Sequence, residues 1–136
     1  MQITREFAKY QLVTLSFGVA NLSASQTDVQ IKDATGQVEG ISMPFAGELL
    51  AISVDTTAAA TAGELTVGAT KGGTENASTT QTITTATAAT NAFARGTATF
   101  VAGDKLGVEI TTSADWDATT ADLSVQLLVA LAVEGV

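Results

Sequence analysis

Large apolar residues occupy every second position of a stretch near the C-terminal end of the chain. They are Leu123, Val125, Leu127, Val129, Leu131 and Val133. Successive side chains of a β-strand point to opposite faces, so these six residues form one apolar row. The β-branched residues and the regular alternation favour a strand over a helix. The run is also shorter than the roughly 18 apolar residues that a membrane-spanning helix needs. The stretch therefore predicts a strand in a buried core.

The opposite row of this stretch changes character along its length. It begins with the polar residues Ser124 and Gln126 and continues with the apolar residues Leu128, Ala130 and Ala132. A strand with one solvated face would stay polar on that face. The change predicts that a second surface is covered towards the C-terminal end, by another sheet, by an N-terminal segment or by another subunit.

Shorter alternating segments elsewhere in the chain predict the remaining strands. They fall at residues 13–19, 29–31, 41–43, 47–55, 65–69, 81–85, 97–101 and 106–110, the segment at 81–85 being weak. Turn residues separate them, and no segment has the period of an amphipathic helix. In residues 47–55, one face is expected to carry Leu50, Ile52 and Val54, and the other Leu49, Ala51 and Ser53. Eight or nine short strands with loops of mixed length predict an all-β jelly-roll sandwich.

Composition limits both the domain organisation and the chemistry. The chain has 136 residues, which is the size of a single domain. It contains no cysteine and no histidine, which excludes disulfides, thiolate metal sites and the commonest general base. Its net charge is −8 with only six Lys or Arg residues, so nucleic acids and anionic membranes are poor partners.

The first residues differ from the rest of the chain. Ile3, Phe7 and Tyr10 are large apolar residues, and Arg5 and Lys9 are two of the six cations. As a helical turn, the segment would place Phe7 and Tyr10 on one face; as an extended arm, it would dock these residues on a neighbour. Because chain termini are usually loose unless tied down, we expect an arm at residues 1–12 and a single jelly-roll domain at residues 13–136.

A loop with two aspartates and the only tryptophan precedes the last strand. Asp115 and Asp117, with Asp122 nearby, could offer carboxylate oxygens to a cation, but their spacing lacks the ordered ligand positions of an EF-hand loop. A solvated acidic turn is the better interpretation. Trp116 could stack on a sugar, although a lone tryptophan in a loop more often seals an end of a sandwich or an interface.

A second candidate for chemistry is the carboxylate pair Glu39 and Glu48, which could act like the two acids of a glycosidase. Nothing in the sequence places them at a catalytic distance, and scattered surface glutamates explain them better. No nucleophile has an evident base. We therefore expect a protein that is not an enzyme, with no metal and no cofactor.

Several phrases of the sequence resemble a known family. They are MPFAGEL at residues 43–49 leading into ISV at 52–54, FVAGDKLGV at 100–108, TTSADW at 111–116 and TTADLSV at 119–125. In these phrases the chain resembles small jelly-roll modules of tailed bacteriophages, over about two-thirds of its length. Such modules occur in head decoration (cement) proteins and in head or tail fibres, and they commonly form trimers.

The resemblance implies a structural role in a virion. The short chain without heptad or collagen-like repeats favours the capsid shell over a fibre. We expect a decoration protein that trimerises, binds the major capsid protein on the outer surface of the head and stabilises the shell, with no nucleic-acid, membrane or small-molecule partner. The expected subunit contacts are Leu128, Ala130 and Ala132, and the expected capsid-contact arm comprises Ile3, Arg5, Phe7, Lys9 and Tyr10.

Two other functions remain open. In the first, the chain is a receptor- or glycan-binding jelly roll of a phage fibre, and Asp115, Trp116 and Asp117 form its binding loop. In the second, it is a bacterial surface-layer or adhesin module. The second is disfavoured because residues 1–10 lack the apolar stretch of a secretion signal.

Overall fold

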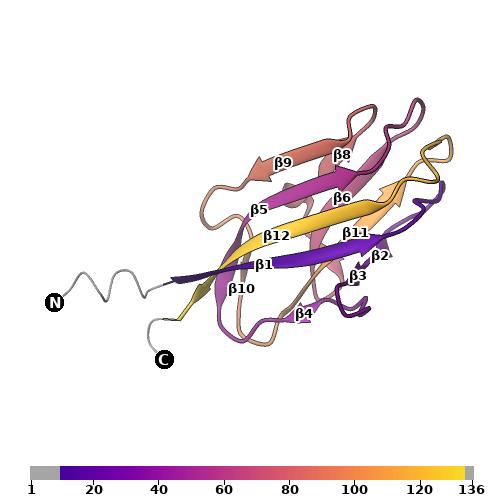
Figure 1. The fold of residues 1–136 in the computed structure, drawn as a ribbon. Coiled ribbons are helices and arrows are strands. Elements are labelled where there is room, and N and C mark those ends of the chain that lie inside the picture. Colours follow the sequence, from indigo (N-terminus) through magenta and orange to yellow (C-terminus); the bar gives the residue numbers. More distant parts are fainter. Residues whose placement is uncertain (1–9, 134–136) are drawn as a thin grey trace.

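The fold is a sandwich of two antiparallel β-sheets, seen in a computed structural model that describes residues 10–133 (Figure 1). The strands are β1 (Tyr10–Val19), β2 (Val29–Gln30), β3 (Lys32–Asp33), β4 (Ile41–Ser42), β5 (Gly47–Thr56), β6 (Leu65–Lys71), β7 (Thr74–Glu75), β8 (Gln81–Ile83), β9 (Ala88–Ala92), β10 (Thr99–Phe100), β11 (Lys105–Thr112) and β12 (Leu123–Ala132). A 3₁₀ turn, η1 (Ala77–Thr79), lies between β7 and β8. No helix within the described residues is long and apolar enough to cross a membrane.

The strand order confirms the predicted jelly roll. One sheet, called here the β12 sheet, has the order β5-β12-β1-β3, and β9 and β10 pair one after the other with the outer edge of β5. The other, the β11 sheet, places β11 beside β6. The short strands β2 and β4 share the outer edge of β11, and β7 and β8 share that of β6. Each pair of short strands fills one strand position, so the expected count of about eight is met by four positions in each sheet, with β3 as an extra edge.

β12 lies at the centre of its sheet. It pairs with β1 over ten residues, from Tyr10 opposite Ala132 to Val19 opposite Leu123, and with β5 on its other side. The predicted apolar row of β12, from Leu123 to Leu131, is buried in the core between the sheets. This row faces buried residues of the β11 sheet such as Val67 and Val108. β12 therefore contributes one continuous apolar row to the core that is buried when the two sheets close on each other.

The prediction of which β5 side chains face the core was wrong for Leu49 and Leu50. Leu128 pairs with Ala51, but the next residue, Val129, pairs with Leu49, so Leu50 is the extra residue of a β-bulge. The bulge turns Leu49 into the core beside Ile52 and leaves Leu50 half-buried. Strict alternation breaks at a bulge because two residues of one strand oppose one of its partner.

Two further elements differ from the expectations. Residues 29–31 were expected as one strand. In the structure β2 ends before the buried Ile31 and β3 begins after it. β2 pairs with β11, whereas β3 pairs with β1 in the other sheet. The chain crosses from one sheet to the other at Ile31. β9 was not predicted at all, because it contains alanine, threonine and asparagine only and is held by backbone pairing to β5.

The boundary of the predicted arm also moves. β1 begins at Tyr10, so Tyr10 and Leu12 belong to the β12 sheet and not to an arm. Ile3, Arg5, Phe7 and Lys9 lie outside the described residues.

Candidate interaction surface

The outer face of the β12 sheet carries two uncharged rows of side chains across four strands. Residues directly opposite each other on β1, β12, β5 and β9 form these rows. The first row is Thr14, Leu128, Ala51 and Ala92, and the second is Ser16, Gln126, Ser53 and Thr90. Side chains of directly opposite residues stand about 5 Å apart on a sheet, so each row is a continuous strip.

These rows line a shallow hollow on the same face. The hollow has a volume of about 480 Å³ and is bordered by residues of both rows, including Leu128, Ala51 and Thr90. Leu128 and Ala51 are half-buried, and Ala92 and Thr90 are exposed. A chain with a net charge of −8 thus has a face on which small neutral side chains surround one leucine. Neutral, charge-depleted surfaces are typical of the centre of a protein interface.

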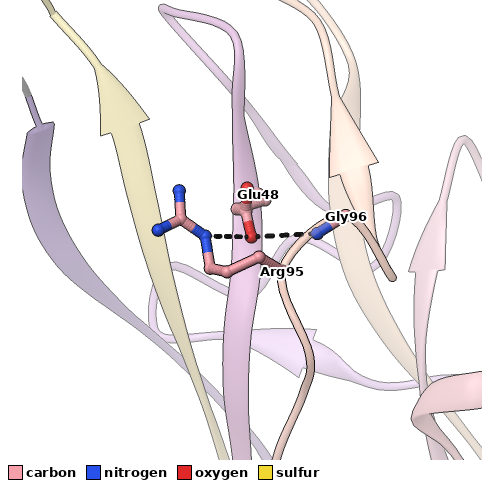
Figure 2. A network of polar contacts seen from close by, with 3 residues as sticks. All are labelled: Glu48, Arg95 and Gly96. Atoms are coloured by element: carbon pink, nitrogen blue, oxygen red, sulfur yellow. Dashed lines mark hydrogen bonds and ion pairs between the residues drawn. The ribbon is translucent and has the colours of Figure 1, made fainter.

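An arginine bridge closes one end of this face (Figure 2). Arg95, in the segment between β9 and β10, donates a hydrogen bond from Nε to Oε1 of Glu48 on β5, at 2.7 Å. The backbone N–H of Gly96 donates to the same oxygen at 3.3 Å. The guanidinium carbon of Arg95 lies 5.4 Å from the centre of the Tyr10 ring on β1, which is within the range of a cation–π interaction.

The arginine bridge explains part of the apolar row that the sequence singled out. Glu48 is opposite Ala130, and Tyr10 is opposite Ala132, with β12 between the two strands that carry them. A side chain that reaches from Glu48 to Tyr10 has to cross β12 at these alanines. Ala130 is accordingly only 3% exposed. Small side chains are needed here because the arginine lies above them.

The three predicted subunit contacts therefore differ in what they can offer a partner. Leu128 lies in the open hollow between Thr14 and Ala51. Ala130 is already buried within the single chain, and Ala132 is half-buried beside Tyr10. The contribution of β5 and β9 to the face was not predicted, because their alanines and serines carry no apolar pattern in the sequence.

The hydrogen bond to Arg95 lowers the pKa of Glu48 from its usual value of 4.5, with a smaller contribution from the N–H of Gly96. A lowered pKa in the folded state stabilises the fold above pH 4.5, and this stabilisation is lost as the pH falls through the lowered value.

We expect Glu48→Gln to reduce the melting temperature at pH 7 by only about 2 °C, because the pair is at the surface. Between pH 5 and pH 3 the melting temperature of the variant should fall less steeply than that of the wild type. Parallel curves in thermal denaturation would contradict this.

The loop of Asp115, Trp116 and Asp117 holds its tryptophan inside the sandwich. Trp116 is 3% exposed and belongs to the core, so its ring is not available to stack on a sugar. Asp117 accepts hydrogen bonds from the backbone N–H and the hydroxyl of Thr61, and Asp115 accepts one from Ser113 at 2.7 Å. The bonds from Thr61 lower the pKa of Asp117. The loop uses its polar groups to seal one end of the sandwich.

The carboxylates considered for chemistry are also separated. Glu39 forms an ion pair with Lys105 of the β11 sheet at 3.1 Å, whereas Glu48 is paired with Arg95 on the β12 sheet. No group of three or more acidic side chains in residues 10–133 has the geometry to hold a metal ion.

No known family model matches the chain, and no curated protein matches it. The geometry of the two uncharged rows on the outer face of the β12 sheet is therefore the main basis for a functional interpretation.

Proposed function

We propose that the chain is a structural virion protein that decorates the outer surface of a tailed-bacteriophage head. Copies would associate into a trimer through the outer face of the β12 sheet and bind the major capsid protein between its subunits. A ligand that binds only the assembled lattice stabilises that lattice by mass action, and this would be its mechanism. Residues 1–9, with Ile3, Arg5, Phe7 and Lys9, would contact the shell.

The observation that carries this proposal is the uncharged strip on the outer face of the β12 sheet. The described residues include twelve acidic and four basic side chains. None of the eight residues in the two rows is charged. Negative charge elsewhere on the surface would keep copies apart, so a neutral strip is the surface on which like-charged copies can meet at least cost. The resemblance of residues 41–133 to phage jelly-roll modules adds the virion context.

Leu128→Glu is expected to weaken self-association at least tenfold, because a carboxylate at the centre of the strip would be desolvated without a partner. The monomer should keep its fold, since Leu128 points away from the core and its side chain is half-buried. Sedimentation velocity over a micromolar concentration series would measure the association, and thermal denaturation at low concentration would measure the fold.

Thr82→Glu is the matched control, because Thr82 is an exposed residue on β8 of the other sheet. It adds the same charge and should leave the association unchanged. A wild-type protein that sediments as a monomer at these concentrations would refute the trimer, and equal effects of the two substitutions would refute the assignment to this face. Electron cryomicroscopy of purified particles tests the location: density for the chain on the outer head surface is expected, and its absence there would refute the decoration role.

The structure gives the fibre alternative less support. A receptor- or glycan-binding loop at residues 115–117 relied on Trp116, which is buried. Specific binding on a glycan array would nevertheless favour a fibre role over decoration.

A further inference from the structure

Two glutamates share one site on the outer face of the β11 sheet. Glu109, at the centre of β11, is opposite Gly68 of β6 and is only 7% exposed. Glu75 of β7 folds its carboxyl group over the same glycine, so closely that a Cβ at Gly68 would overlap Glu75 Oε1. The missing side chain of Gly68 thus creates the space in which the two carboxyl groups meet.

The hydrogen bonds around the pair hold both carboxyl groups in place. Gln30 of β2 donates from Nε2 to Glu109 Oε2 at 3.1 Å, and its Oε1 accepts from the Thr70 hydroxyl at 3.3 Å. Thr80 donates its hydroxyl to Glu75 Oε1 at 2.6 Å. The Glu75 carboxyl group, folded over Gly68, lies beside Glu109 of β11, and burial together with the charge of Glu75 raises the pKa of Glu109. Two carboxyl groups in such a space repel each other when both are charged and can hydrogen-bond when one of them carries a proton.

The charged groups near the pair increase the preference of Glu109 for a proton. Asp28, before β2, is linked to Thr111 of β11, and its carboxylate is a further negative charge near Glu109. The two lysines at the ends of β6 and β11 interact elsewhere: Lys71 donates to the Thr99 carbonyl, and Lys105 pairs with Glu39. Burial raises the pKa of Glu109 first, followed by repulsion from Glu75 and Asp28, and the bond from Gln30 opposes this only in part.

We propose that Glu75 and Glu109 form a proton-operated latch, in which one shared proton holds β7 against the β11 sheet and its loss releases β7. β7 is the part that can move. It is a two-residue strand that follows the turn of Gly72 and Gly73, and it pairs with β6 only at Thr70 and Lys71. When both carboxylates are charged, repulsion drives Glu75 out of the space above Gly68, because Glu109 is fixed in the centre of its sheet.

The sign of the pH dependence follows from the latch. A group whose pKa is raised by folding stabilises the folded state below its unfolded value of 4.5, and this stabilisation is lost as the pH rises through the raised value. Asp33, Glu48 and Asp117 have lowered pKa values, so they titrate below this range and act in the opposite direction. A loss of stability on raising the pH above 4.5 therefore reports on the latch.

Hydrogen exchange of the wild-type protein and two amide variants tests the latch. The Asn76 amide, which donates to the Ala69 carbonyl at 2.9 Å next to β7, is the probe. Its protection factor, corrected for intrinsic exchange, is expected to fall about tenfold between pH 5 and pH 8 in the wild type. Glu109→Gln and Glu75→Gln should each abolish this fall, since an amide donates the hydrogen bond of the shared proton at every pH. The melting temperature of both variants should lose its decline over the same range.

Glu64→Gln is the control, because Glu64 is an exposed glutamate just before β6. It should retain the wild-type pH dependence. Carboxyl carbon NMR of the wild type gives a direct readout, with Glu109 expected to titrate above 4.5. Titration of Glu109 at or below that value would overturn the proposal, and so would equal pH dependence in the three variants. Neither result depends on oligomerisation, so the latch and the decoration role can fail independently.

Discussion

Leu127→Ala is expected to lower the free energy of unfolding by about 3 kcal/mol. Leu127 is fully buried on β12, opposite Leu15 on one side and Ile52 on the other. Truncation removes its contacts and leaves space that the surrounding strands cannot fill. A hollow of about 370 Å³ between the sheets already borders Leu127. The side chain therefore has fewer packing contacts to lose on that side, and we expect a loss of stability below the upper end of the range for such substitutions.

The neighbouring residue provides the control. Leu128→Ala removes the same atoms from the opposite face of β12, where the side chain is half-buried, and should cost less than about 1 kcal/mol. Urea denaturation at low protein concentration compares the two folds without a contribution from association. Equal costs would contradict the register of β12, because a slip of one residue exchanges the two faces.

Gly47→Ala is expected to destabilise the protein by about 2–3 kcal/mol through overpacking. Gly47 begins β5 and lies opposite Leu131 of β12 and Phe100 of β10. A Cβ at this position would overlap the Ala130 carbonyl oxygen and would lie 3.0 Å from the Phe100 ring. The oxygen belongs to the backbone of the central strand, so it cannot move aside without disturbing the pairing of β5 with β12.

Gly107→Ala is the comparison for this variant. The nearest atom to its Cβ would be the Thr70 hydroxyl, at 2.9 Å, and a side chain can rotate where a backbone carbonyl cannot. Chemical denaturation should therefore show a smaller loss for Gly107→Ala. A Gly47→Ala variant as stable as the wild type would mean that β5 and β12 do not approach each other as closely as described.

The core strands were predictable because their patterns are strictly local. In β11 and β6 the large residues alternate, and in β12 they occupy every second position of one row, so burial of one face follows from the period of a strand. The same reasoning failed at Leu50, because a bulge depends on how β5 pairs with β12. It also failed for β9, which contains no large residue and is defined by the backbone hydrogen bonds of its neighbour.

The candidate surface was predicted only at Leu128. The sequence did indicate that the second row of β12 is covered towards its C-terminal end, and it left open what covers it. The structure shows that Arg95 lies over part of this row, although Arg95 is far from it in sequence. The carboxyl pair of Glu75 and Glu109 had no signal in the sequence, since only the pairing of β6 with β7 and β11 brings the two residues to one glycine.

The alternation of apolar residues was enough to predict an all-β sandwich with a buried apolar row in its last strand. Alternation along a strand decides which side chains share a face, and apolar burial decides which face turns inward. The arrangement of side chains on the outer faces of the sheets depends instead on how the strands pair. The neutral strip around Leu128, the arginine bridge over Ala130 and the two carboxyl groups above Gly68 each join strands that are distant in the chain. Such contacts depend on register and sheet order, which alternation within a single strand does not encode.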